Sequence, residues 1–243
     1  MCRMFMLDGG FREDFHEIFE VAKLISCNDP LRRLSENLPK DHKDGWGFVN
    51  LTDREIFYYR TSSPLCESSQ PEIKDGKIIF HMRNAAPNEP MGIHNSHPFH
   101  LSTVEGDFYL AHNGWFNKEK IANFIGLKNY KLENDSLVFL RFLASLEGDI
   151  ESKIRKSIDI SLKMGFIIST ANLLLLYVDK SGKSELYAIT ESSPDANYGV
   201  YQELYMIENS KWKGIFSSSF IEFSEIKKLG KFSKLNKGSI YKI

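Results

Sequence analysis

The order of its secondary-structure patterns restricts the fold of this chain more than any other feature. Strand-like patterns fill most of the first 112 residues, helical patterns follow between residues 118 and 163, and strand-like patterns return from residue 173. One further helical pattern near the start is marked by Phe15, Ile18 and Ile25. Because strands and helices are segregated along the chain, the pattern predicts an α+β domain in which two sheets pack together and helices lie outside them.

The individual elements are bounded by turn and capping residues. Gly9 and Gly10 separate the first strand from the first helix, for which Asp14 and Glu17 fit a capping pair. The later helices are expected at 118–125, 136–146 and 150–163. The strands are expected at 2–7, 45–50, 55–60, 77–83, 107–112, 173–178, 185–190, 200–206, 214–218 and 239–243.

Composition excludes several classes of protein. With 243 residues and 42% apolar content, the chain can bury the core of a single domain, which we expect to span 1–243. A formal net charge of -1 without runs of like charge argues against nucleic acid as a partner. The longest apolar run, 173–178, is too short to cross a membrane, and charged residues interrupt the region where a signal peptide would lie. We therefore expect a cytoplasmic protein without a membrane segment.

Cysteine at position 2 is the first residue that indicates chemistry. A small second residue allows Met1 to be removed, which leaves the Cys2 thiol beside a free α-amine. The usual pKa of such an amine, about 8, lies close to that of a thiol, so one residue can supply both nucleophile and base. Taken alone, Cys2 is equally consistent with a buried strand residue, which is the common role of a free cysteine.

Three further positions combine a strand end or helix start with a polar side chain. Arg83 follows an apolar strand and can offer two donors to a carboxylate. Asn113 and Gly114 follow another strand and can both donate to a developing oxyanion, although Asn-Gly is also a common turn. Asp135 stands at a helix start, where it either binds an ammonium group or caps the helix.

The ordered set of motifs resembles the glutaminase domain of class II glutamine amidotransferases, which are N-terminal nucleophile hydrolases. The stretch 42–47 resembles a signature of the short stand-alone branch of that family. The motifs cover residues 2 to about 145, and the remainder is similar only in its strand pattern. They are Cys2, Arg83, Asn95-Ser96-His97-Pro98-Phe99, His112-Asn113-Gly114 and Asp135-Ser136.

The resemblance implies a fold and a mechanism. The fold would be a four-layer αββα sandwich of two mainly antiparallel sheets, formed by a single glutamine amidotransferase type 2 domain without a cofactor or a metal. Cys2 would be the nucleophile, with its α-amine as the base, and Asn113 and Gly114 would form the oxyanion hole. The activity would be hydrolysis of the side-chain amide of L-glutamine or of a related γ-glutamyl amide.

The resemblance also assigns the substrate-binding residues. Arg83 would hold the substrate α-carboxylate and Asp135 the α-amino group, so that each charged pole of glutamine has a partner. His97 is assigned to the same side of the site, as a structural residue that hydrogen-bonds near the nucleophile.

Two departures from the family pattern bear on substrate and partner. Asn84 and Ala86 stand where synthase-linked members carry an aromatic residue and a threonine, and Leu137 stands where a glutamate is common. The residues after 145 are needed to complete one sandwich, so we expect that they do not form a synthase domain. The chain is then either a plain hydrolase or half of an enzyme whose ammonia-using synthase is a separate subunit, and a homo-oligomer stays open.

Three alternatives remain at this point. His94, His97 and His100 recur at intervals of three and, with His81 and His112, suggest a metal site, but Pro98 argues against a helix that would align them. Cys2 with His97 or His112 could form a conventional cysteine-histidine pair. The third alternative is a non-catalytic module of the same fold that senses glutamine or docks a partner. The remaining cysteines, Cys27 and Cys66, are expected to be buried and inert.

Overall fold

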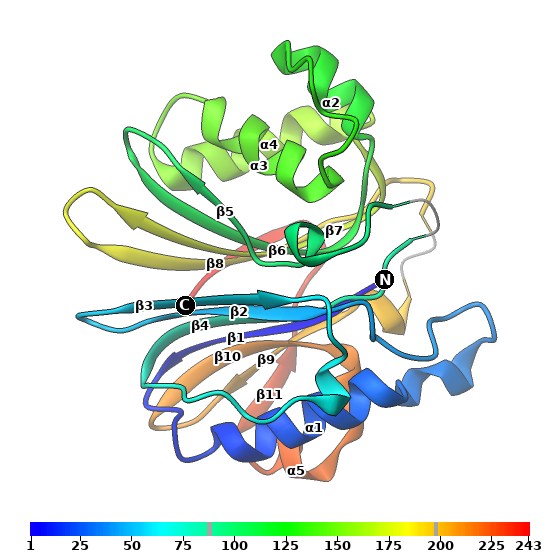
Figure 1. The fold of residues 1–243 in the computed structure, drawn as a ribbon, viewed down its shortest axis with the longest axis vertical. Coiled ribbons are helices and arrows are strands. Elements are labelled where there is room, and N and C mark those ends of the chain that lie inside the picture. Colours follow the sequence, from blue (N-terminus) through cyan, green and yellow to red (C-terminus); the bar gives the residue numbers. More distant parts are fainter. Residues whose placement is uncertain (87–88, 197–198) are drawn as a thin grey trace.

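The computed structural model describes residues 1–86, 89–196 and 199–243, and two antiparallel sheets stacked face to face form its centre (Figure 1). The seven-stranded sheet, in the order β11-β9-β10-β1-β4-β2-β3, consists of β1 (Arg3–Gly9), β2 (Trp46–Leu51), β3 (Ile56–Thr61), β4 (Gly76–Met82), β9 (Leu204–Glu208), β10 (Trp212–Ser217) and β11 (Lys231–Lys234). The five-stranded sheet, in the order β12-β8-β7-β6-β5, consists of β5 (Phe99–Ser102), β6 (Gly106–Phe116), β7 (Ile167–Asp179), β8 (Ser184–Thr190) and β12 (Ser239–Lys242).

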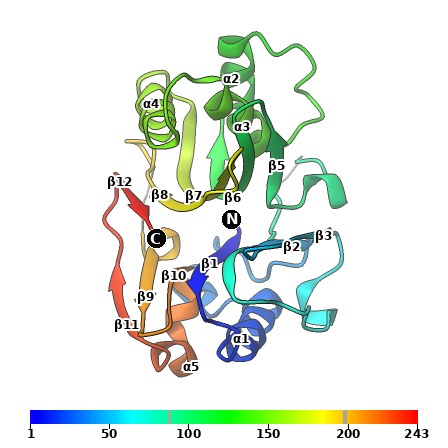
Figure 2. The same cartoon turned by 90° about the vertical axis from the view of Figure 1, so that its left-hand side faces the viewer.

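Helices cover the outer face of each sheet (Figures 1 and 2). The five-stranded sheet is covered by α2 (Lys118–Ile125), α3 (Asp135–Ser145) and α4 (Ile150–Lys163), and the seven-stranded sheet by α1 (Phe15–Cys27) and the short α5 (Ser224–Lys227). The predicted αββα sandwich is therefore confirmed. Within the described ranges, no helix has the length and apolar character that crossing a bilayer requires.

The alternation of side chains along β1 explains why the layers stack as they do. Phe5 and Leu7 point to one side, where they join the apolar cluster under α1. Met4 and Met6 point to the other side, into the cluster between the two sheets. Because every residue from Met4 to Leu7 is fully buried, this strand needs a covered surface on both of its faces.

The apolar run in β7 has the same origin. Leu174 and Leu176 face the other sheet, whereas Leu173 and Leu175 face the helices. A strand that is buried on both faces has no position for a polar residue, so the sequence shows an unbroken apolar run rather than alternation. The apolar run 173–178, which is too short to cross a membrane, thus belongs to the central strand of the five-stranded sheet.

Several predicted elements differ from the observed ones. The predicted strand at 200–206 begins instead with the 3₁₀ turn η4 (Val200–Gln202), and its strand runs from Leu204 to Glu208. The strands β5 and β11 and the helix α5, of four residues each, were not predicted, although the equally short β12 was. The other 3₁₀ turns are η1 (Pro30–Leu34), η2 (Leu65–Glu67), η3 (Ile93–Asn95) and η5 (Ser218–Glu222).

Two expectations about single side chains are wrong. Asp14 precedes α1 but makes no capping hydrogen bond, because its carboxylate accepts one from Trp212 Nε1 at 2.7 Å, far away in the sequence. Cys27 is exposed at the end of α1 and Cys66 is half-buried in η2, so neither is the buried thiol that we expected.

The register of the central strands brings the chain start to the site. β1 pairs with β4 so that Arg3 lies opposite Met82, which places Cys2 beside Arg83 at one edge of the sandwich. β6 of the facing sheet carries Asn113 toward the same edge, where Figure 2 shows the N-terminus between the two layers. The site therefore draws on both sheets.

Candidate active site

The residues singled out from the sequence meet at a small cavity of about 50 Å³. It lies where β1 begins, β4 and β6 end and α3 begins. Five of the six candidate side chains or backbones line this cavity, and the sixth, Asn113, is hydrogen-bonded to the backbone of Cys2. The lining candidates are Cys2, Arg83, His97, Gly114 and Asp135.

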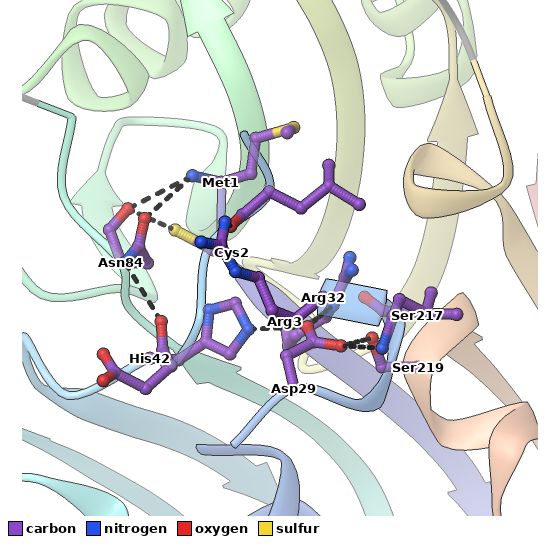
Figure 3. Close-up of polar contacts among 12 residues, drawn as sticks. Met1, Cys2, Arg3, Asp29, Arg32, His42, Asn84, Ser217 and Ser219 are labelled. Carbon is purple, nitrogen blue, oxygen red and sulfur yellow. Dashed lines mark hydrogen bonds and ion pairs between the residues drawn. The ribbon is translucent and has the colours of Figure 1, made fainter. Parts of the chain in front are cut away.

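Cys2 is held by contacts to its backbone and to its sulfur. Its N–H donates to Asn113 Oδ1 at 2.8 Å, and its Sγ donates to the carbonyl of Asn84 at 3.6 Å (Figure 3). Asn84 is itself anchored, because its Nδ2 donates to the carbonyl of Asp41 at 3.0 Å. With Met1 attached, the terminal amine of Met1 donates to Asn84 Oδ1 at 3.2 Å, and burial lowers the pKa of that amine.

Only the oxygen of the Asn113 side-chain amide is hydrogen-bonded to a described residue. Its Oδ1 accepts from Cys2, while its Nδ2 is buried and has no hydrogen-bond partner among the described residues. A buried donor without a partner costs free energy unless a ligand supplies an acceptor. Beside it, Gly114 lies so close to the neighbouring strand β7 that a Cβ would lie 1.7 Å from the carbonyl oxygen of Thr170. Only glycine fits at this position.

Arg83 is fixed from both its backbone and its side chain. Its N–H donates to the carbonyl of Gly45 at 2.8 Å, and its carbonyl accepts from Asp44 N at 3.1 Å. Its guanidinium is almost fully buried and donates to the carbonyl of Pro90 at 2.8 Å and to the sulfur of Met91 at 3.4 Å. No carboxylate pairs with this guanidinium among the described residues, which leaves a buried positive charge beside the cavity.

The stretch 42–47 has a clear structural task. Its Asp44 and Gly45 hold the backbone of Arg83, and the Asp44 carboxylate also accepts from Ala85 N at 2.8 Å. Gly45 has a φ of +116°, and a Cβ there would lie 2.4 Å from the carbonyl oxygen of Thr61. The motif therefore fixes the strand end that carries Arg83.

Asp135 opens α3 and is buried at the cavity wall. Its Oδ2 accepts from Phe116 N at 2.8 Å and keeps a free lone pair, whereas its Oδ1 accepts from Ser136 N at 2.8 Å and from Ser136 Oγ at 3.3 Å. Asn134, not Asp135, occupies the capping position, with its side chain accepting from Ser136 N at 3.0 Å. Burial raises the pKa of Asp135 more than these hydrogen bonds lower it.

Three buried histidines lie close together, and one of them, His97, lines the cavity. His112 bonds to Ser136 Oγ at 2.9 Å and to the carbonyl of Thr170, and His81 bonds to the carbonyl of His112. His97 lies against His81, with ring centroids 4.2 Å apart, and neither of its ring nitrogens has a hydrogen-bond partner among the described residues. The expected hydrogen bond of His97 near the nucleophile is therefore wrong for this structure.

Two rival site chemistries find no support in these contacts. The hydrogen bond of the Cys2 sulfur goes to a backbone carbonyl, and neither His97 nor His112 bonds to it. His94 and His100 are exposed, away from the buried histidines. Across the described ranges, no three side chains of His, Cys, Asp or Glu gather as metal ligands would.

A buried ionic network lies directly behind the nucleophile (Figure 3). The Asp29 carboxylate accepts from Arg3 Nε at 2.8 Å, bonds to His42 Nε2 at 2.8 Å, and accepts from Ser219 Oγ at 2.7 Å and Tyr201 OH at 3.1 Å. Arg3 and Asp29 are both fully buried, and the partners hold the pKa of Asp29 well below its usual range. Through Arg3, the residue after Cys2, the network ties β1 to four other segments of the chain, which contain Asp29, His42, Tyr201 and Ser219.

Sequence reasoning missed two contributors to this region. Asn84 was noted only as a departure from the family pattern, yet its carbonyl accepts a hydrogen bond from the Cys2 thiol. Asp29 lies in a loop before Pro30, where an aspartate reads as a cap of η1, and it does accept from Leu31 N at 3.0 Å. Its long-range partners carry no local signal.

The chain has a structural likeness to a known enzyme but no sequence match. No family model matches the sequence, and no curated protein matches it either. Among solved structures, glutamine phosphoribosylpyrophosphate amidotransferase from B. subtilis superposes on 100% of this chain with a TM-score of 0.68 and 14% identity. The chain shares the fold of that enzyme.

The match has a defined extent. This chain spans 47% of the amidotransferase chain, so the likeness concerns less than half of that protein. A "predicted glutamine amidotransferase from Pseudomonas aeruginosa PA01" is matched over 100% of this chain and 93% of its own, with 14% identity and a TM-score of 0.45. The architecture shared with the B. subtilis enzyme is a sandwich of two antiparallel sheets covered by helices.

The Asp29 network predicts a large stability effect. In the variant Asp29→Asn the shape is kept, but the buried Arg3 guanidinium loses its counter-charge, so the free energy of unfolding should fall by about 3 to 5 kcal/mol. Glu222→Gln is the control, because it removes an exposed pair with Arg33 and should cost at most about 1 kcal/mol. Urea denaturation measures both, and equal small losses would contradict a compensating role for Asp29.

The buried histidines predict loss of stability in mild acid. Burial lowers the pKa of His42 and His112 to about 4, that of His81 to about 3, and that of His97 well below its usual value. The unfolded chain therefore binds more protons below pH 6.5, and each histidine can remove up to about 1.4 kcal/mol per pH unit. Asp135 and Glu89, whose pKa values burial raises, act in the opposite sense but are fewer.

Urea denaturation at pH values between about 7 and 5 tests this expectation. The free energy of unfolding should fall steadily as the pH is lowered through the usual histidine pKa. Replacement of the exposed His94 by glutamine should leave the slope unchanged. A stability that is flat over this pH range would show that the buried histidines are not held neutral.

Proposed function

We propose that this protein, once Met1 is removed, is an N-terminal nucleophile amidohydrolase that acts on the side-chain amide of L-glutamine or of a related γ-glutamyl amide. The observation that carries the proposal is the position of the Asn113 amide. Its oxygen accepts a hydrogen bond from the backbone nitrogen of Cys2, which would become the free α-amine, and its NH₂ group is buried without a hydrogen-bond partner among the described residues.

The chemistry follows from these positions. The Cys2 α-amine takes the thiol proton, and the sulfur attacks the amide carbon of the substrate. Asn113 Nδ2 and the backbone of Gly114 stabilise the negative oxygen that forms. The amine returns the proton to the leaving nitrogen, the carbon–nitrogen bond breaks, and ammonia or an amine leaves behind a thioester. Water then attacks the thioester and releases the γ-carboxylate.

The charges around the cavity fit the two poles of glutamine. The Arg83 guanidinium is buried without a carboxylate partner among the described residues, and it retains N–H groups for a substrate carboxylate. Asp135 is buried at the cavity and keeps acceptor capacity for an ammonium group. His97 lines the same cavity with two unpartnered ring nitrogens, which makes it a third candidate contact for the substrate.

One observation supports a second function, a glutamine-binding module without turnover. With Met1 attached, the nitrogen of Cys2 is a peptide N–H that cannot accept a proton, and Met1 itself lines the cavity. The form that carries Met1 would then bind ligand at most, and only the processed form would hydrolyse it. We propose that the activity is cytoplasmic. A separate ammonia-using synthase subunit and a second copy of this chain are the partners that the processed form could have.

The nucleophile variant gives the first functional prediction. Processed wild-type protein should release ammonia from glutamine, and Cys2→Ala should abolish this release because no other residue can form the thioester. Ammonia and glutamate are measured by coupled assays, and mass spectrometry of the intact protein verifies that Met1 has been removed.

The Cys66→Ala variant is the matched control, since this half-buried thiol lies in η2 and does not line the cavity. It should retain the activity of the wild type. Equal rates for wild type and Cys2→Ala, with glutamine and with γ-glutamyl amides, would rule out the proposed enzyme.

A further inference from the structure

The cavity wall contains a third charged side chain that the proposed mechanism does not use. Glu89 lies in the connection between β4 and η3 and lines the same cavity as Arg83 and Asp135. The resemblance to the amidotransferases assigned no role to it. A carboxylate at this place adds negative charge to the side of the pocket where an ammonium group would bind.

The contacts of Glu89 leave it poorly compensated. Its Oε2 is shut off from solvent and has no hydrogen-bond partner among the described residues. Its Oε1 lies 3.9 Å from Lys118 Nζ, a loose distance, and the same ammonium group donates to the carbonyl of Glu133 at 3.1 Å. Burial, followed by the nearby charge of Asp135, raises the pKa of Glu89. The ion pair with Lys118 therefore does not satisfy this carboxylate.

The geometry of the pocket limits what can satisfy it. Asp135 is buried and Glu89 is half-buried, and two carboxylates that line one cavity disfavour each other unless a cation lies nearby. A primary ammonium is compact and offers three donors, whereas a guanidinium is larger and planar. Asp135 Oδ2 has a free lone pair for one of these donors, and Glu89 Oε2, which has no hydrogen-bond partner among the described residues, can accept another.

The geometry points to Glu89 as a specificity-determining residue that, together with Asp135, binds the free α-ammonium group of the substrate. This inference rests on the proposed function and defines its substrate class more narrowly. The accepted substrates are γ-glutamyl compounds with an unmodified α-amino group. Glutamine residues within a peptide and α-N-acylated glutamine are excluded, because an acyl nitrogen has no positive charge to offer the two carboxylates.

The test measures binding in a protein that cannot turn over its ligand. Processed Cys2→Ala protein and its Glu89→Gln derivative are titrated by calorimetry with glutamine and with glutaric acid monoamide, which has the carboxylate and the amide but no α-amino group. Glu89→Gln should weaken glutamine binding about 10- to 100-fold, the usual range for loss of a hydrogen bond to a charged group. Binding of glutaric acid monoamide should stay the same or improve, since it has no ammonium group to lose.

The possible results distinguish a failure of the Glu89 inference from a failure of the proposed function. Glu119→Gln changes an exposed glutamate nearby on α2 and should bind both ligands as the parent protein does. Unchanged glutamine affinity in Glu89→Gln, or equal weakening for both ligands, would overturn the role of Glu89 while leaving the proposed function intact. Absence of glutamine binding in the parent Cys2→Ala protein would overturn the proposed function and this inference with it.

Discussion

The contact between Cys2 N and Asn113 Oδ1 is the interaction on which the whole site depends. Cys2 precedes β1 of one sheet and Asn113 lies in β6 of the other, so this bond of 2.8 Å exists only when the two sheets are stacked in the observed register. The NH₂ group of the same amide is buried and has no hydrogen-bond partner among the described residues. One side chain thus fixes the start of the chain and orients an unused donor beside it.

Electrostatics gives this corner of the protein its second constraint. The positive charge of Arg3 is neutralised within the fold by Asp29, whereas the positive charge of Arg83 is not neutralised by any described carboxylate. Both guanidinium groups are buried at nearly the same depth, but one has its counter-charge built in and the other faces the cavity. This difference separates a structural ion pair from a group that an anionic ligand can satisfy.

Much of the fold and the site could be predicted from the sequence for specific reasons. Strands buried on both faces, such as β7, leave long apolar runs, and the helices α2 to α4 show clear periodicity. Arg83 follows β4 and Asp135 begins α3, so element ends located them, whereas Asn113, expected to follow a strand, lies within β6. Among the residues that were missed, Asn84 and Glu89 lie outside the helices and strands and Asp29 lies in a loop before η1, and their contacts are made across the fold.

Side chains with two plausible partners were the other source of error. Asp14 is a good helix cap by residue type, but an indole N–H that is 198 positions away in the chain binds its carboxylate instead. Cys27 was expected to be buried because free cysteines usually are, yet it ends α1 at the surface. In both cases tertiary context, which a local pattern does not contain, decided the outcome.

The reactivity of the Cys2 thiol in the processed protein is the most direct test of this account. A glutamine analogue with a chloromethyl ketone in place of the amide should alkylate this sulfur with loss of chloride, and peptide mass spectrometry locates the adduct. The account predicts rapid labelling of Cys2 that excess glutamine suppresses, and little labelling when Met1 is retained. Labelling of the exposed Cys27 with Cys2 unmodified, or equal labelling of the form that carries Met1, would contradict it.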